Sequence, residues 1–224
     1  MIGYHGLPTT RKQVSMSPLT DKYPSLMKRS MDLSCAFAGL IICSVMLAGL
    51  SLLIKVSSPG PVFFRQARVG RDRRQFTILK FRTMHRDAEE VLRNDEALYQ
   101  QYLDNDFKLP EGQDPRITPV GRWLRRTSLD ELPQLFNVLV GDMSMVGPRP
   151  VVPEELERYG DSMSYYLAVK PGLTGLWQVC GRSDVDYPQR VDFDKRYVKG
   201  WCLLLDLKIL ALTIPAAIRG NGAH

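Results

Sequence analysis

The stretch around which the chain is organised reads Arg125-Arg126-Thr127-Ser128-Leu129-Asp130-Glu131-Leu132-Pro133-Gln134-Leu135-Phe136-Asn137. It places two adjacent acids, Asp130 and Glu131, between a basic pair and apolar residues at helical spacing. Ser128 lies three residues before Glu131 and therefore fits a helix capping box. Pro133 leaves two starts open for the helix: about one turn earlier, with the acids in the first turn, or at the proline, with the acids just outside. Either start puts both acids at the positive end of a helix dipole.

An acidic pair in this position has two interpretations. It can simply complement the helix dipole, which is the commoner role of such residues. Alternatively it is a chemical centre, because Arg125 and Arg126 precede it and Arg149 follows the helix in a Gly147-Pro148-Arg149-Pro150 turn. A carboxylate kept ionised by arginines is a competent nucleophile or metal ligand, and the same surroundings can hold a phosphate. The residues by themselves leave both interpretations open.

Four motifs bear on this choice. They are Lys80-Phe81-Arg82-Thr83-Met84, Thr127-Ser128-Leu129-Asp130-Glu131-Leu132-Pro133-Gln134, Gly147-Pro148-Arg149-Pro150 and Lys170-Pro171-Gly172-Leu173-Thr174-Gly175-Leu176-Trp177-Gln178-Val179. In content and order they resemble the motifs of the bacterial sugar transferases, the monotopic phosphoglycosyl transferases that begin membrane glycoconjugate synthesis. The resemblance extends from about Lys28 to the C-terminus.

The resemblance implies a reaction. A hexose 1-phosphate would pass from a UDP-sugar to undecaprenyl phosphate through a phosphosugar-aspartyl intermediate on Asp130, with release of UMP. Mg²⁺ would be held by Glu131 and phosphate oxygens, where it reduces the repulsion between carboxylate and diphosphate. The form of residues 175–179 and of residues 201–218 is more similar to hexose-1-phosphate transferases of exopolysaccharide, capsule or O-antigen synthesis, which favours UDP-glucose or UDP-galactose.

Several residues are candidates for substrate binding. Arginine suits bidentate phosphate contacts, which points to Arg125, Arg149 and Arg182. A period of two places Lys80 and Arg82 on one strand face, and the family motif makes Lys80 a site residue. The resemblance adds Gln178 and supports Arg182 as nucleotide or phosphate contacts.

The predicted fold class is α+β: a mostly helical monotopic membrane enzyme with a re-entrant membrane helix, a small β-hairpin and interfacial amphipathic helices. Residues 1–27 are expected to form a flexible tail without a signal peptide, residues 28–56 the membrane helix, and residues 57–224 a cytoplasmic catalytic domain. Strands over residues 62–64 and 75–82 predict the hairpin. Helices are expected over residues 86–104 and 153–169, and a glycine loop over residues 170–179.

The membrane segment contains 22 uncharged residues, 33–54, which is long enough to cross a bilayer. Basic residues are nearly balanced on its two sides, which gives no orientation and is expected if both ends stay cytoplasmic. The resemblance implies a re-entrant helix at the inner membrane of a bacterium. Relatives usually carry a proline at the bend; here Ser44, Gly39 and Gly49 would have to permit it. Asp206 and Lys208 disfavour a second span over residues 201–218, leaving an interfacial helix or one buried against the core.

The formal charge of +6 suits a membrane surface or a nucleotide. Nucleic acid is not an expected partner, because no helix-turn-helix, zinc or stacking-aromatic motif accompanies the charge. The four cysteines lack metal-ligand spacing and are expected to be free thiols. A homodimer is possible by resemblance. The competing functions are a catalytically silent membrane scaffold that recruits glycan-assembly partners and a single-spanning protein with its soluble part outside the cytoplasm.

Overall fold

The computed structural model describes residues 26–104, 109, 114–181 and 185–219. Residues 1–25 of the predicted tail therefore lie outside the described residues. Helices predominate beside two small sheets, which confirms the α+β class. The helices are α1 (Leu26–Ile42), α2 (Ser44–Ser57), α3 (Ala88–Asn94), α4 (Glu96–Asp104), α5 (Pro119–Arg126), α6 (Gln134–Val140), α7 (Pro153–Leu156), α8 (Met163–Leu167), α9 (Leu176–Cys180), α10 (Tyr187–Gly200) and α11 (Leu203–Arg219). The strands are β1 (Phe63–Val69), β2 (Gln75–Phe81), β3 (Ser144–Val146) and β4 (Gly172–Thr174).

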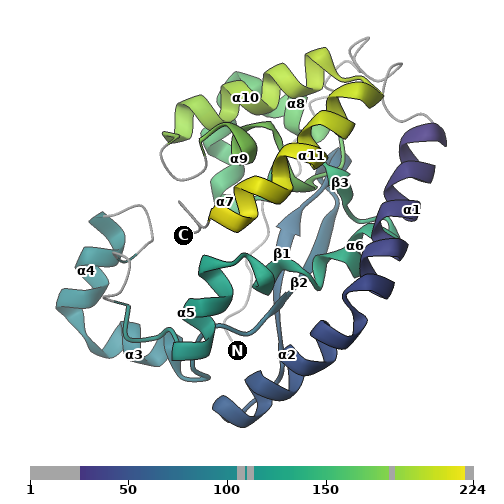
Figure 1. Ribbon diagram of the computed structural model, residues 1–224. Coiled ribbons are helices and arrows are strands. Elements are labelled where there is room, and N and C mark those ends of the chain that lie inside the picture. The colour runs from purple at the N-terminus through teal and green to yellow at the C-terminus, as the bar shows by residue number, and fades with distance from the viewer. Residues whose placement is uncertain (1–25, 105–108, 110–113, 182–184, 220–224) are drawn as a thin grey trace.

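The elements surround the hairpin of β1 and β2 (Figure 1). Helices α1 and α2 follow one another along one side of the molecule, and α6 lies between α1 and the hairpin. Helices α8, α10 and α11 gather at one end, whereas α3 and α4 lie away from them. The predicted site residues that the structure describes lie in or next to β2, in α5 and α9, in the segment between α5 and α6, and after β3.

Helices α1 and α2 meet at Cys43 and are bent by 62° with respect to each other. The Ser44 hydroxyl donates to the Ile41 carbonyl at 2.8 Å, so a serine bonding back to the backbone accompanies the break in place of a proline. Within the described ranges, no helix alone has the length and apolar character needed to cross a bilayer; the bent pair together does. Both helices expose large apolar side chains: Leu26, Met27, Leu33, Phe37, Ile41, Ile42, Val45, Met46, Leu52, Leu53 and Val56.

The structure confirms the predicted hairpin, and its first strand, β1, is longer than the predicted residues 62–64. Phe64 lies opposite Lys80, and Arg68 lies opposite Phe76. Residues that are directly opposite share a face, and side chains two or four apart on one strand share it as well. Arg68 and Lys80 therefore point to the same side of the hairpin.

Asn137 of α6 covers the free edge of β2. Its Oδ1 accepts from the Leu79 backbone N–H at 3.0 Å, and its Nδ2 donates to the Thr77 carbonyl at 2.7 Å. One amide side chain thus replaces the backbone of a neighbouring strand. This contact fixes the helix that follows the acidic pair against the strand that carries Lys80.

Strands β3 and β4 form a parallel pair that the sequence did not predict, with Ser144 opposite Gly172 and Val146 opposite Thr174. The backbone N–H of Gly172 in β4 also donates to the carbonyl of Pro148, which follows the end of β3, at 2.8 Å. A Cβ at Gly172 would overlap the backbone of Gly147. The turn of residues 147–150 is therefore held by a backbone approach that requires glycine.

Three predicted elements need correction. Residues 86–104 form two helices, because Asp95 is extended and its carboxylate accepts from the Leu98 N–H at 2.9 Å, as a helix-starting residue does. Residues 153–169 are interrupted at Gly160, whose φ of 47° cannot continue a helix. Residues 170–179 contain β4 and most of α9 instead of a loop.

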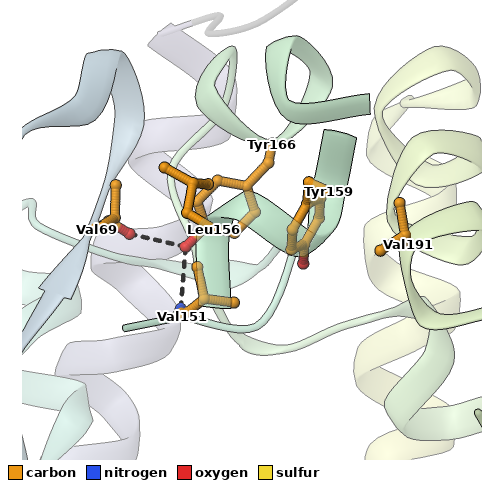
Figure 2. Packing of buried hydrophobic residues seen from close by; sticks show 6 residues of the cluster. All are labelled: Val69, Val151, Leu156, Tyr159, Tyr166 and Val191. Carbon is orange, nitrogen blue, oxygen red and sulfur yellow. Dashed lines mark hydrogen bonds between the residues drawn. The ribbon is translucent and has the colours of Figure 1, made fainter. Parts of the chain in front are cut away.

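The Tyr166 hydroxyl connects the end of β1 to the segment that follows residues 147–150 (Figure 2). It donates to the Val69 carbonyl at 2.7 Å and accepts from the Val151 N–H at 3.1 Å. Val69 also donates its N–H to the Val151 carbonyl at 3.0 Å. Tyr166 is buried, as are Leu156 and Tyr159 in the same cluster.

A buried ionic cluster joins α1 to α11. Lys28 Nζ lies 2.8 Å from Asp206 Oδ2 and 3.2 Å from Asp32 Oδ1, and the side chains of Lys28 and Asp206 are 2% and 0% exposed. The Tyr197 hydroxyl donates to Asp206 at 2.8 Å. Lys28 is thus a core residue and not a surface charge beside the membrane segment. Helix α11 packs against the core on this side, and its opposite side exposes Leu204, Leu207, Leu212 and Ile214.

Candidate active site

The acidic pair lies in a single 3₁₀ turn, Leu129–Glu131, between α5 and α6. Ser128 precedes it in a left-handed conformation, with φ of 55°, and its side chain makes no capping hydrogen bond. The predicted capping box is therefore wrong, because a capping residue needs an extended backbone to aim its oxygen at the helix. Helix α6 begins only after Pro133, so the acids lie just outside it, as the second of the two predicted starts requires.

Two cations converge on Glu131. Lys80 Nζ from β2 lies 2.7 Å from Glu131 Oε1, and Arg149 Nη1 from the turn after β3 lies 3.5 Å from the same oxygen. Burial by itself raises the pKa of Glu131, but the charges of Lys80 and Arg149 outweigh it and lower the pKa to about 2. Glu131 is accordingly ionised at neutral pH.

Asp130 has the opposite electrostatic balance. The residue is 9% exposed, and burial raises the pKa of its carboxyl to about 6, with Lys80 acting against the shift and the Glu131 charge adding to it. The positive charge of Arg125 also favours the ionised form of Asp130, while Arg125 Nε donates to Thr83 Oγ1 at 3.0 Å. A partly desolvated carboxylate of raised basicity is suited to nucleophilic attack.

The pocket over Glu131 contains a residue that sequence reasoning missed. Its polar lining comprises Arg68, Lys80, Glu131, Gln134, Arg149 and Gln178. The sequence pattern did not distinguish Arg68 from the other arginines of the hairpin, because several of them occur close together. Its position relative to Lys80 in the hairpin register is the signal that could have singled it out.

Gln178 reaches the same pocket from α9. Its Nε2 donates to the Leu173 carbonyl at 3.4 Å, and its Oε1 lies close to Gly175. Oε1 is buried and accepts no hydrogen bond within the described part of the chain. Gln178 therefore offers a buried acceptor to a donor group of a ligand.

Of the predicted site residues that the structure describes, Arg82, Arg125 and Asp130 do not line this pocket. Arg82 lies beyond the end of β2 and turns toward the end of α2, where Nη2 donates to the Ser58 carbonyl at 2.7 Å and Nη1 to the Pro59 carbonyl at 3.1 Å. The strand alternation that grouped it with Lys80 ends at Phe81. Arg182 lies outside the described residues.

The carboxylates of this site fit a magnesium ion only if a substrate supplies further oxygen ligands. Among the residues whose placement is described, no group of three or more His, Cys, Asp or Glu side chains could hold a metal ion. Mg²⁺ is commonly held by one or two carboxylates, waters and substrate phosphates, and Glu131 and Asp130 supply such carboxylates.

The adjacent carboxylates and the cations around them form an arrangement that is chemically suited to holding phosphate groups. The chain belongs to the bacterial sugar transferase family, whose model matches residues 23–220.

Its relatives include the undecaprenyl-phosphate galactose phosphotransferase of Salmonella typhimurium, 49% identical over 92% of this chain and 43% of the relative. The UDP-glucose:undecaprenyl-phosphate glucose-1-phosphate transferase of Escherichia coli is 42% identical over 89% of this chain and 42% of the relative. The exopolysaccharide production protein ExoY of Sinorhizobium fredii is 45% identical over 88% of both chains. The chain therefore spans less than half the length of the first two relatives and most of the third.

Proposed function

We propose that this protein is a phosphoglycosyl transferase that moves a hexose 1-phosphate from a UDP-sugar to undecaprenyl phosphate and releases UMP. The observation that carries the proposal is the buried Asp130 carboxylate next to the ionised Glu131, which is paired with Lys80 and Arg149. This arrangement provides both a nucleophile and the positive charge that a diphosphate requires.

Two displacements account for the transfer. An oxygen of Asp130 attacks the phosphorus next to the sugar, the bond from that phosphorus to the bridging oxygen breaks, and UMP leaves with the electron pair. An oxygen of undecaprenyl phosphate then attacks the same phosphorus, and the Asp130 carboxylate departs. The soluble donor and the membrane-held acceptor thereby use one site in turn.

Lys80 and Arg149 serve this reaction by facing the phosphoryl oxygens, whose negative charge a fixed cation stabilises without reorganising. Arg125 supports the ionised form of Asp130. Mg²⁺ bound by Glu131 and the donor phosphates would supply further neutralisation of the diphosphate. Gln178 would accept a hydrogen bond from the nucleotide or the sugar.

The bent pair α1 and α2 is the proposed membrane element. We infer that it enters the inner membrane from the cytoplasmic face and returns to it, since the pair is bent by 62° and exposes apolar side chains along its length. The exposed apolar side of α11 would lie at the same surface. Association into a homodimer remains a prediction.

UDP-glucose and UDP-galactose are the proposed donors, because relatives named for galactose and for glucose are similar to this chain to comparable degrees. A panel of UDP-sugars, assayed for UMP release with undecaprenyl phosphate in detergent, would identify the donor. Absence of UMP release with every donor would favour the scaffold function.

The decisive test is Asp130→Asn, which keeps the shape of the side chain and removes the nucleophilic charge. We expect turnover to fall roughly a thousandfold or more. No radiolabel should pass from a UDP-sugar labelled in its proximal phosphate to the protein. Asp192→Asn, an exposed change on α10, is the matched control and should label as the unmodified protein does. Full activity of Asp130→Asn, or an adduct on another residue, would contradict the mechanism.

A further inference from the structure

Arg68 holds a buried hydrogen-bond donor that the proposed chemistry has not used. Its Nη1 donates to the Pro150 carbonyl at 3.1 Å and its Nη2 to Gln66 Oε1 at 2.6 Å. Its Nε is buried and has no acceptor in the part of the chain that the structure describes. A buried donor without a partner costs free energy, so its place in the pocket indicates an acceptor that arrives with a ligand.

The charge around Arg68 favours an anionic acceptor. Burial and the nearby guanidinium charge of Arg149 both lower the pKa of Arg68, whereas the charges of Glu155 and Glu131 raise it. Glu131, the acidic residue that lines the pocket, already pairs with Lys80 and Arg149. The pocket thus has more positive charge than its own acids neutralise, and a bound phosphate would offset this excess.

The position of Arg68 is fixed on both sides. Val69 follows Arg68, and Val151 follows Pro150, whose carbonyl accepts from Arg68. The Tyr166 hydroxyl joins Val69 to Val151 (Figure 2). The guanidinium therefore connects the end of β1 to the residue that follows Arg149. Such a group is oriented before the ligand arrives, which favours a specific contact.

We propose that Arg68 is a phosphate-binding residue of the donor site, with its Nε–H directed at an oxygen of the diphosphate of a nucleoside diphosphate. The inference rests on the proposed function and adds Arg68 to Lys80 and Arg149 as the third cation of this site. Its contact with the Pro150 carbonyl also positions the turn that carries Arg149.

The test measures binding of UDP and of uridine, which lacks the phosphates, by isothermal titration to the full chain in detergent with magnesium. Arg68→Lys keeps the charge but loses the Nε–H, and we expect it to bind UDP at least tenfold more weakly and uridine as before. Arg65→Lys is the control, because Arg65 is exposed and lies on the opposite face of the same strand. UDP affinity of Arg68→Lys within twofold of the unmodified protein, or an equal loss for uridine, would overturn the proposal. If the unmodified protein fails to bind UDP, the proposed function itself fails.

A second measurement avoids dependence on the variant's folding. The unmodified protein is treated with phenylglyoxal, which modifies arginine, and the modified residues are mapped by mass spectrometry. UDP should slow the modification of Arg68 at least fivefold, uridine should not, and Arg65 should react equally in all samples. Equal rates at Arg68 with and without saturating UDP would overturn the proposal.

Discussion

At the scale of single residues, Asp130 and Glu131 differ because they share one set of cations unequally. Lys80 and Arg149 contact Glu131 directly, which lowers the pKa of that carboxyl, whereas at Asp130 burial and the negative charge of Glu131 outweigh the nearby positive charges and raise the pKa. Two neighbouring acids thereby acquire different protonation behaviour, and this is the usual basis for different chemical roles. Glu131 is suited to hold a cation and Asp130 to attack.

This difference predicts the pH dependence of the first step. Burial raises the pKa of Asp130 to about 6, so the protonated, unreactive form accumulates below that pH. The single-turnover rate of UMP release should therefore rise as the pH increases through about 6 and level off above it. Because Lys80 lowers the pKa of Asp130, Lys80→Met should move the midpoint to higher pH. A rate that is constant across this range would show that Asp130 ionisation does not limit the step.

Glu131→Gln tests the proposed metal ligand. The amide keeps the size of the side chain but loses the charge that attracts a hard cation. The magnesium concentration for half-maximal activity should increase roughly tenfold. Glu157→Gln, an exposed change, should leave it unaltered. An unchanged magnesium response in Glu131→Gln would remove this residue as a ligand.

At the scale of elements, the site is positioned by short segments and not by long helices. The acids lie in a 3₁₀ turn, Arg149 in the turn after β3, and Gln178 in the short α9. Periodicity predicted the hairpin correctly because each strand is long enough to alternate. It misjudged residues 86–104 and 153–169, because one extended residue and one left-handed glycine interrupt otherwise helical composition.

The close approach of β4 to the residue that follows β3 provides a test at this scale. Gly172→Ala adds a methyl group where the Gly147 backbone lies, so the strands must move apart. We expect a loss of roughly 1–3 kcal/mol in the free energy of unfolding, measured by denaturant titration, together with reduced activity because the Arg149 turn moves. Gly200→Ala is the control, since no atom lies within 4 Å of an added Cβ there. Equal stability of both variants would contradict the close approach.

At the scale of the whole molecule, the first and last described helices are locked together by charge. Lys28 of α1 and Asp206 of α11 form an ion pair from which water is excluded, and Asp32 and Tyr197 complete its hydrogen bonds. Such a cluster fixes how the two helices meet, because removing one charge leaves the others buried and unpaired. The proposed membrane element and the catalytic core are thereby joined through buried groups.

Lys28→Met should consequently lower the free energy of unfolding by about 3–5 kcal/mol. Adding Asp206→Leu should recover part of this loss, because the uncompensated carboxylate is then removed. Lys208→Met, an exposed change on α11, is the control and should stay within about 0.5 kcal/mol of the unmodified protein. Denaturant unfolding in detergent measures all three. A small effect of Lys28→Met would indicate that the cluster is hydrated.

The sequence by itself determined the hairpin, the uncharged segment that becomes α1 and α2, and the acidic pair beside a helix start. These depend on periodicity and on contacts between neighbours, which a linear pattern records. Only the tertiary structure decided which cations reach the acids: Lys80, Arg149 and Arg68 line the pocket, whereas Arg82 is used to hold the end of α2. It also decided that Lys28 meets Asp206 and that β3 pairs with β4. Each of these contacts joins residues far apart in the chain, and their partners are selected by packing and burial of the intervening elements.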